Sequence, residues 1–194
     1  MKNKTNYVIL RIVTVGLMAA LVFIGNYFQI KIPNGGLVTR IHLGNSMCLL
    51  AGLLFGGIQG GLSSGIGAAL YDMFDPVYIT SAPYTFLSKF AMGFTAGILR
   101  RKGHNKAAVI GAAAAGQVVY IILYLAKTYV SQILLGEPSS VALAKVGVNA
   151  LTSSINGILA VVIAVPLYFA LEHSLRQTGF AEIINGRKSE PAKA

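Results

Sequence analysis

The chain has 194 residues, of which 55% are hydrophobic and 11% are charged, and its mean hydropathy is +0.66. A soluble domain carries roughly 25% charged residues, so this composition excludes a water-soluble globular protein. The net charge is +10, but the basic residues lie beside apolar stretches rather than on one amphipathic face, which argues against nucleic acid as a partner.

The first apolar segment predicts a helix over about residues 7–29, with basic residues at its N-terminal end. No small-residue cleavage site is followed by a soluble chain, so we expect this helix to be retained. Within it, Gly16 and Ala20 form a small-xxx-small pair, with Ala19 beside them. Such a groove can receive a helix of another protein, and packing within this chain explains it equally well.

The rest of the chain alternates apolar segments with short stretches rich in proline, glycine and serine. The apolar segments predict five further helices, over about residues 42–56, 58–74, 83–100, 106–134 and 140–172. Since about 20 apolar residues cross a ~30 Å hydrocarbon core, we expect an all-α, polytopic membrane protein with six transmembrane helices. Residues 1–175 would form this six-helix membrane domain, and residues 176–194 a polar cytoplasmic tail.

Basic residues gather in three places: the N-terminus, the segment RRKGHNK that begins at Arg100, and the C-terminal tail. With six spans, all three lie on one side of the membrane, which the positive-inside rule identifies as the cytoplasm. Both termini are therefore expected to be cytoplasmic, in a multi-pass protein of the bacterial cell membrane. The connections 30–41, 75–82 and 135–139 are then loops on the outer side.

Three lysines, Lys89, Lys127 and Lys145, fall inside predicted spans at similar depths in the outer third of the membrane. Such charged residues either face a cavity or a partner, or extend their stems so that the ammonium group reaches the lipid headgroups. A pocket role is favoured for Lys89, which lies roughly 9 Å below the outer end of its helix. For Lys127 and Lys145 neither interpretation is preferred.

Other polar side chains occur at the same level on several different segments. They are Arg40, His42 and Asn45 around the start of the second helix, Tyr71 and Asp72 at the end of the third, Tyr84 in the fourth, Tyr120 and Tyr124 in the fifth, and Asn149, Ser153 and Asn156 along one face of the sixth. Each group also has a simpler explanation, because tyrosines form belts at membrane boundaries, and asparagine and serine hydrogen-bond neighbouring helices or cap a helix start. Their convergence predicts a pocket for a small polar ligand.

The motifs of several common enzymes and pumps are absent from the sequence. It contains no HExxH, Walker A or GxSxG motif and no pair of carboxylates placed for catalysis. No acidic residue lies in the middle of a predicted span, where a proton or sodium relay would need one. We therefore expect a protein that binds its ligand without converting energy, that is not an enzyme, and that needs no metal or cofactor.

Residues 41–99, which begin with IHLGNSMCLLAGLLFGGIQGG and include APYTFLSKFAMG, resemble the substrate-binding S components of energy-coupling factor (ECF) vitamin transporters. The resemblance is close over roughly a third of the chain, and the six-helix layout extends it over the rest. Asn45 stands where the family often has aspartate, and Gly57 or its neighbour stands where it often has proline.

The resemblance implies a protein that captures a vitamin or vitamin precursor outside the cell and delivers it inward. The pocket would lie among the last three helices under the outer loops. A transmembrane coupling subunit and two cytoplasmic ATPases would be the partners, and only they would use ATP. Gly16, Ala19 and Ala20 would contact the coupling subunit.

The resemblance is closest to members for hydroxymethylpyrimidine, pyridoxine and riboflavin. The lysines and Arg40 instead favour an acidic ligand such as pantothenate. Two other functions remain open: a stand-alone homo-oligomeric transporter, and a membrane-embedded enzyme that uses Asp72, His42 and Lys89.

Overall fold

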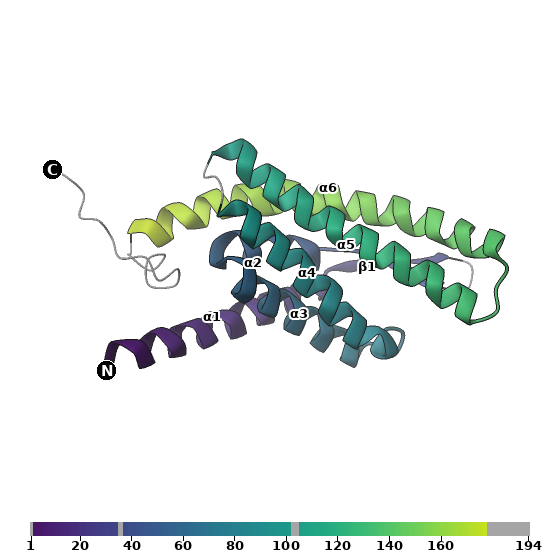
Figure 1. Cartoon of the computed structure of the whole chain (residues 1–194), viewed down its shortest axis with the longest axis horizontal. Helices are drawn as coiled ribbons and strands as arrows, with labels where there is room; N and C mark the ends of the chain where they lie inside the picture. Colours follow the sequence, from purple (N-terminus) through teal and green to yellow (C-terminus); the bar gives the residue numbers. More distant parts are fainter. Residues whose placement is uncertain (1, 35–36, 102–104, 178–194) are drawn as a thin grey trace.

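The computed structural model of the chain describes residues 2–34, 37–101 and 105–177. This part of the chain is mostly helical, with six α-helices, one β-hairpin and a short 3₁₀ helix (Figure 1). Their order is α1 (Lys2–Tyr27), β1 (Gln29–Asn34), β2 (Leu37–His42), α2 (Gly44–Phe55), α3 (Gly57–Phe74), η1 (Ile79–Ser81), α4 (Ala82–Arg100), α5 (Lys106–Leu134) and α6 (Ser139–Gln177).

The β-hairpin takes the place of the first outer loop. β1 and β2 pair antiparallel, from Gln29 opposite His42 to Asn34 opposite Leu37. As a result α1 ends at Tyr27 and α2 begins at Gly44, and the prediction of an all-α chain is wrong for this segment. The ladder satisfies backbone donors and acceptors that would otherwise lie unpaired beside the helices.

The other helices follow the predicted boundaries closely, and α6 continues to Gln177 rather than ending at 172. Among the described residues, three stretches are long and apolar enough to cross a membrane: Val8–Tyr27, Lys106–Leu134 and Ser139–Ser174. α2 is apolar but has only 12 residues. Length and composition alone thus identify fewer spans than the six predicted.

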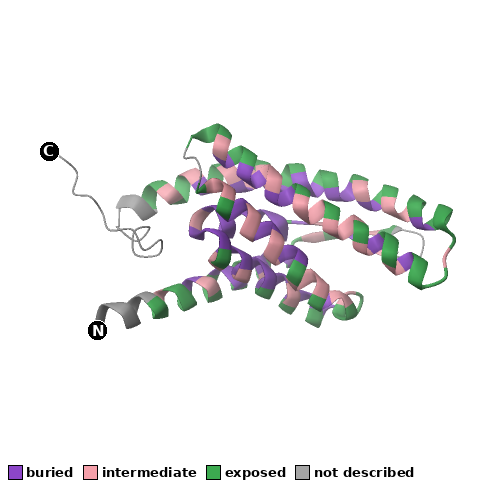
Figure 2. Cartoon of the chain, in the orientation of Figure 1, coloured by how far each residue is buried: buried purple, intermediate pink, exposed green. Residues whose placement is uncertain are grey.

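The centre of the molecule lies where α2, α3 and α4 meet, and buried residues concentrate there (Figure 2). Their close approach depends on glycine: a Cβ atom on Gly93 of α4 would lie 2.6 Å from the carbonyl oxygen of Gly60 in α3. Gly56 makes the turn between α2 and α3 with φ of 83°, a conformation that other residues rarely adopt. Small residues therefore set the spacing of these three helices.

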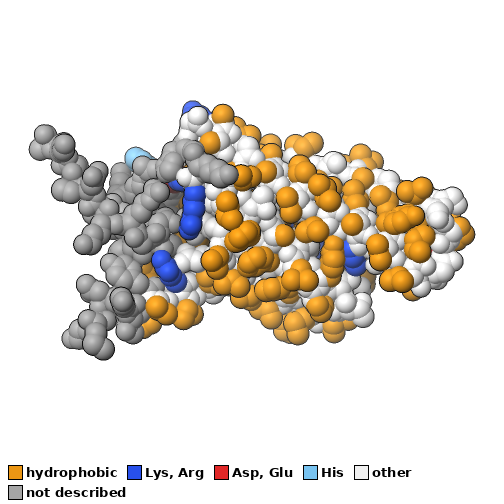
Figure 3. Space-filling view, viewed as in Figure 1, with side chains coloured by type: hydrophobic (Ala, Val, Ile, Leu, Met, Phe, Trp, Pro, Cys, Tyr) orange, Lys and Arg blue, Asp and Glu red, His pale blue; other side chains and the backbone are white. Residues whose placement is uncertain are grey.

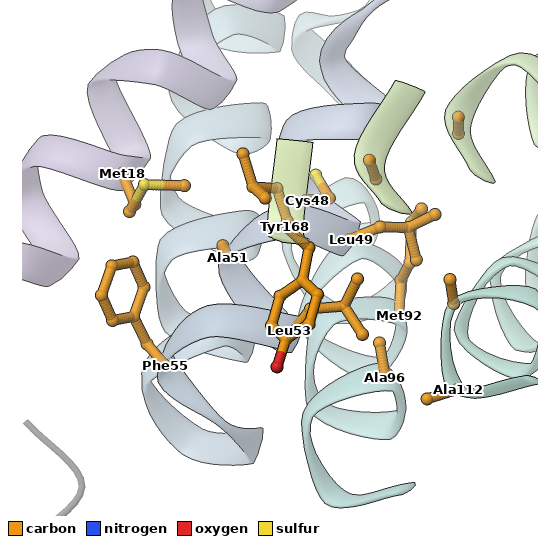
Figure 4. Packing of buried hydrophobic residues seen from close by; sticks show 14 of the residues in the cluster. Met18, Cys48, Leu49, Ala51, Leu53, Phe55, Met92, Ala96, Ala112 and Tyr168 are labelled. Atoms are coloured by element: carbon orange, nitrogen blue, oxygen red, sulfur yellow. The ribbon is translucent and has the colours of Figure 1, made fainter. Parts of the chain in front are cut away.

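A hydrophobic core joins all six helices. Side chains such as Met18, Leu49, Met92 and Ala112 belong to it from α1, α2, α4 and α5 (Figure 4). Cys48 is fully buried in the same cluster.

Large hydrophobic side chains also cover much of the surface, as Figure 3 shows for one face. A soluble monomer does not expose apolar patches of this extent, so lipid is the solvent that suits this surface. The start of α1, the end of α6, the end of α4 and the start of α5 lie toward the same end of the molecule (Figure 1). The predicted polar tail beyond Gln177, with Arg187, Lys188 and Lys193, lies outside the described residues.

Candidate ligand-binding site

A cavity of about 480 Å³ is lined in part by the second half of α5 and the first half of α6, two segments that lie away from the start of α1 (Figure 1). Most of its lining residues belong to α4, α5 and α6. The end of α3, η1 and β2 supply most of the others. Cavities that hold small ligands measure roughly 300–1,000 Å³, so its size fits a vitamin.

Ten of the twelve predicted ligand-binding residues line this cavity. They are Arg40, His42, Asp72, Tyr84, Lys89, Tyr120, Tyr124, Lys127, Asn149 and Ser153. The other two lie directly behind the wall: Asn45 accepts a hydrogen bond from Lys89, and the ring of Tyr71 lies beside the Arg40 guanidinium at 5.2 Å. The structure thus brings together side chains from five separate segments of the chain.

Arg40 and Asp72 form a buried ion pair at the cavity edge, with 2.5 Å between Nη2 and Oδ1. The exposed fraction of the Arg40 side chain is 11% and that of Asp72 is 1%. The guanidinium carbon also lies 4.0 Å from the ring centroid of Tyr78, which suits a cation–π contact. This pair ties the hairpin to α3, and within the described residues the second guanidinium nitrogen, Nη1, has no hydrogen-bond partner.

The hairpin has two further attachments. Asn156 of α6 donates to the Arg40 carbonyl oxygen at 2.6 Å and accepts from the His42 amide at 3.0 Å. Lys31 of β1 and Asp75, just after α3, form an ion pair at 2.8 Å. Burial alone would raise the pKa of Asp75, but the hydrogen bonds from Lys31 and from the Val77 amide outweigh it, and the pKa lies below its ordinary value.

The three lysines that the sequence places inside predicted spans differ in their surroundings. Lys89 is 2% exposed, and its ammonium group donates to Asn45 and lies 3.7 Å from the ring centroid of Tyr120. Lys127 lines the cavity and donates to the Ser81 hydroxyl at 2.8 Å. Both ammonium groups therefore have partners within this chain.

Lys145 lies behind the cavity wall. It donates to the Gln132 amide oxygen at 2.7 Å and pairs with Glu137 at 3.3 Å, and it does not line the cavity.

Aromatic and amide side chains complete the wall. Tyr120 and Tyr124 stack with their ring planes 12° apart, and the Tyr84 hydroxyl donates to the Leu123 carbonyl oxygen at 2.5 Å. Asn149 donates to Thr128, so it joins α6 to α5 as well as lining the cavity. The polar face of α6 therefore both lines the cavity and hydrogen-bonds a neighbouring helix.

Several lining residues were not among the predicted site residues. Thr39 enters the cavity from β2, and the prediction of a loop there gave no reason to select it. Thr128 lies one helical turn after Tyr124, and Ser88 one turn after Tyr84, so helical spacing from the chosen tyrosines is a signal that finds both.

The predicted interface on α1 divides between two faces of the helix. Gly16 and Ala20 are exposed, and a Cβ atom on Gly16 would meet nothing within 4 Å. Ala19 is 5% exposed and its backbone packs against Gly67 of α3. Ala19 therefore serves packing inside this chain, and only the other two are accessible to a partner.

The chain is similar to known transport proteins in sequence and in fold. The family model for the ECF-type riboflavin transporter S component matches residues 6–173. The S component of a bacterial ECF transporter superimposes with a TM-score of 0.69 at 19% identity, covering 91% of this chain and 99% of that one. The S component for biotin from an ECF-type ABC transporter superimposes with a TM-score of 0.57 at 24% identity, covering 84% and 92%.

No curated protein matches the sequence. The two solved structures share the fold of this chain at low sequence identity, whereas the family model matches its sequence over most of its length. The family consists of integral membrane proteins that bind small vitamin ligands and work with a coupling subunit and ATPases, so it is a family of transport subunits rather than of enzymes. The chain belongs to the family of ECF-type riboflavin transporter S components.

Proposed function

We propose that the cavity holds a heteroaromatic vitamin of the riboflavin type, captured from the outer side of the membrane. The stacked pair of Tyr120 and Tyr124 carries this proposal, because flat aromatic side chains beside a cavity suit a ring ligand. Asn149, Ser153 and Thr128 supply hydrogen-bonding groups around them. Hydroxymethylpyrimidine and pyridoxine are smaller ligands of the same kind, and the same wall would suit them.

The proposal includes six membrane crossings with both termini in the cytoplasm. α2 alone is about 18 Å long and is too short for a ~30 Å core, and part of β2, whose six residues span about 20 Å, would complete this crossing. The end of α4 and the start of α5, which lie toward the same end of the molecule as the start of α1 and the end of α6 (Figure 1), carry Arg100, Arg101 and Lys106, as expected for the cytoplasmic side. The cavity then faces outward.

Gly16 and Ala20 are proposed to contact the coupling subunit. Both are exposed on α1 and lie one turn apart, so they leave a shallow groove for a partner helix. Gly16→Leu combined with Ala20→Leu should abolish uptake in cells that hold the coupling subunit and ATPases, while the affinity for vitamin changes less than threefold. A loss of affinity equal to the loss of uptake would contradict this assignment.

The two rival functions make different predictions. A stand-alone transporter would take up vitamin in liposomes without the coupling subunit and ATPases, and an enzyme would convert the vitamin into a product. We expect reversible binding and no conversion, since Asp72 is held by Arg40 and Lys89 by Asn45.

Isothermal titration calorimetry of the detergent-purified chain tests the proposed ligand class. Riboflavin, pyridoxine and hydroxymethylpyrimidine are titrated in turn, and at least one should bind with one-to-one stoichiometry. Tyr120→Leu should weaken that binding, while Tyr129→Leu, on the same helix and absent from the cavity lining, serves as the matched control. Failure of all three compounds to bind would refute the proposal.

A further inference from the structure

The charged side chains around the cavity are unbalanced. Arg40, Lys89 and Lys127 bring three cationic groups to its lining, and Asp72 is the one carboxylate among the described lining residues. That carboxylate is already engaged by Arg40 at 2.5 Å. In the part of the chain that the structure describes, no carboxylate lies within ion-pair distance of the ammonium group of Lys89 or Lys127.

Lys89 is in the less favourable position of the two. Its side chain is 2% exposed, and its ammonium group contacts the neutral amide of Asn45 and the ring of Tyr120. An ammonium group removed from water loses several kcal/mol of solvation, and a neutral acceptor with a cation–π contact restores only part of it. An anion placed beside the group would restore much more, because attraction between charges strengthens where water is excluded.

Hydrogen-bond donors nearby are also without partners. Within the described residues, Nη1 of Arg40 and Nδ2 of Asn45 are buried and have no acceptor. Asn45 contacts Lys89, and Arg40 lines the same cavity. An oxyanion of a ligand next to Lys89 would supply hydrogen-bond acceptors for these donors. The apolar edge of a neutral ring would supply none.

We propose that the cavity selects ligands that carry an oxyanion, either a carboxylate or a phosphate, and that Lys89 is the residue that binds it. Lys127, whose ammonium group lies at the η1 edge of the cavity, adds a second positive charge that attracts the ligand's oxyanion. This inference rests on the proposed function, because it names the chemical class of the vitamin in that same site.

Three pairs of compounds test it, each with a neutral and an anionic member: riboflavin and flavin mononucleotide, pyridoxine and pyridoxine phosphate, and pantothenol and pantothenate. Calorimetry on the purified wild-type chain gives the affinity of each. In every pair that binds, the anionic member should bind at least tenfold more tightly. This comparison needs no variant, so it does not depend on whether a substitution disturbs folding.

Variants then assign the effect to one residue. Lys89→Met should reduce the anion preference to less than threefold by weakening only the anionic member, and Lys89→Arg should keep the preference because it keeps the charge. Lys106→Met removes one charge far from the cavity lining and should leave all affinities unchanged. Each variant is compared at the same ionic strength, because screening weakens charge pairs.

The outcomes separate this inference from the proposed function. Equal or tighter binding of the neutral members overturns the oxyanion assignment and leaves vitamin binding intact. If Lys89→Met weakens the affinity for the neutral and the anionic member of a pair equally, the assignment is also overturned, because the lysine would then maintain the structure of the cavity wall rather than bind the ligand's charge. If none of the six compounds binds, both proposals fail.

Discussion

Asp72→Asn tests whether the Arg40–Asp72 pair holds the hairpin over the cavity. The substitution keeps the shape of the side chain and removes its charge, which leaves the guanidinium of Arg40 buried without its counter-ion. Breaking a buried ion pair from one side costs about 3–5 kcal/mol. For a chain of this length one kcal/mol corresponds to roughly 2–4 °C in Tm, so we expect a loss of roughly 10 °C.

The outer pair provides a control in the same hairpin. Lys31 is 43% exposed, and exposed ion pairs contribute about 0–1 kcal/mol, so Asp75→Asn should lower Tm by no more than about 4 °C. Combining Asp72→Asn with Arg40→Gln removes both charges and should recover part of the stability lost in the single variant.

Thermal unfolding of the detergent-purified variants gives these Tm values, with hydrogen exchange of residues 38–42 as a local probe of the hairpin. Asp72→Asn should accelerate exchange there more than Asp75→Asn does. If the two single variants have the same Tm, or if the double variant is no more stable than Asp72→Asn alone, the buried pair does not hold the hairpin.

Three more predictions address the hairpin and the helix packing. Asn156→Leu removes both hydrogen bonds to β2 and should weaken vitamin binding at least tenfold, and unchanged affinity would show that the hairpin is held without it. Gly93→Val should prevent folding or lower Tm by more than 10 °C, because its Cβ atom would meet the Gly60 backbone, whereas Gly147→Val has open space and should fold normally; equal effects would contradict the close approach. The pKa of Asp75 is low in the folded chain, so its contribution to stability is present above its unfolded pKa and is lost as the pH falls through the folded value. The Tm difference between wild type and Asp75→Asn should therefore stay constant from pH 8 to about pH 5 and shrink below about pH 4, and a difference that grows on acidification would reverse the sign of this reasoning.

Most helices were predictable because they are long apolar segments bounded by glycine, proline or basic residues, whereas α2 has only 12 residues. α5 begins and ends at the predicted residues, since Asn105 caps its first turn and accepts from the Ala108 amide at 2.8 Å. The hairpin was missed because KIPNGGLVTR has the composition of a loop. It also contains an Asn-Gly pair between apolar residues, which is a sequence signal for a β-hairpin.

The site was partly predictable for a different reason. Polar residues are costly inside a membrane, so each of them marked either a cavity or a contact between helices, and most proved to line one cavity. What the sequence could not give was the direction of individual side chains. Ala19 and Gly16 look alike in the sequence, and only the packing of α1 against Gly67 separates the buried one from the exposed one.

Native mass spectrometry of the detergent-purified chain tests most directly whether this protein is a vitamin-binding subunit. The protein is extracted from cells grown in rich medium, and the mass of any compound released from it is measured. We predict one bound heteroaromatic vitamin per chain, lost from the Tyr120→Leu variant. An empty chain that also takes up none of riboflavin, pyridoxine and hydroxymethylpyrimidine when they are added would contradict the proposed binding site.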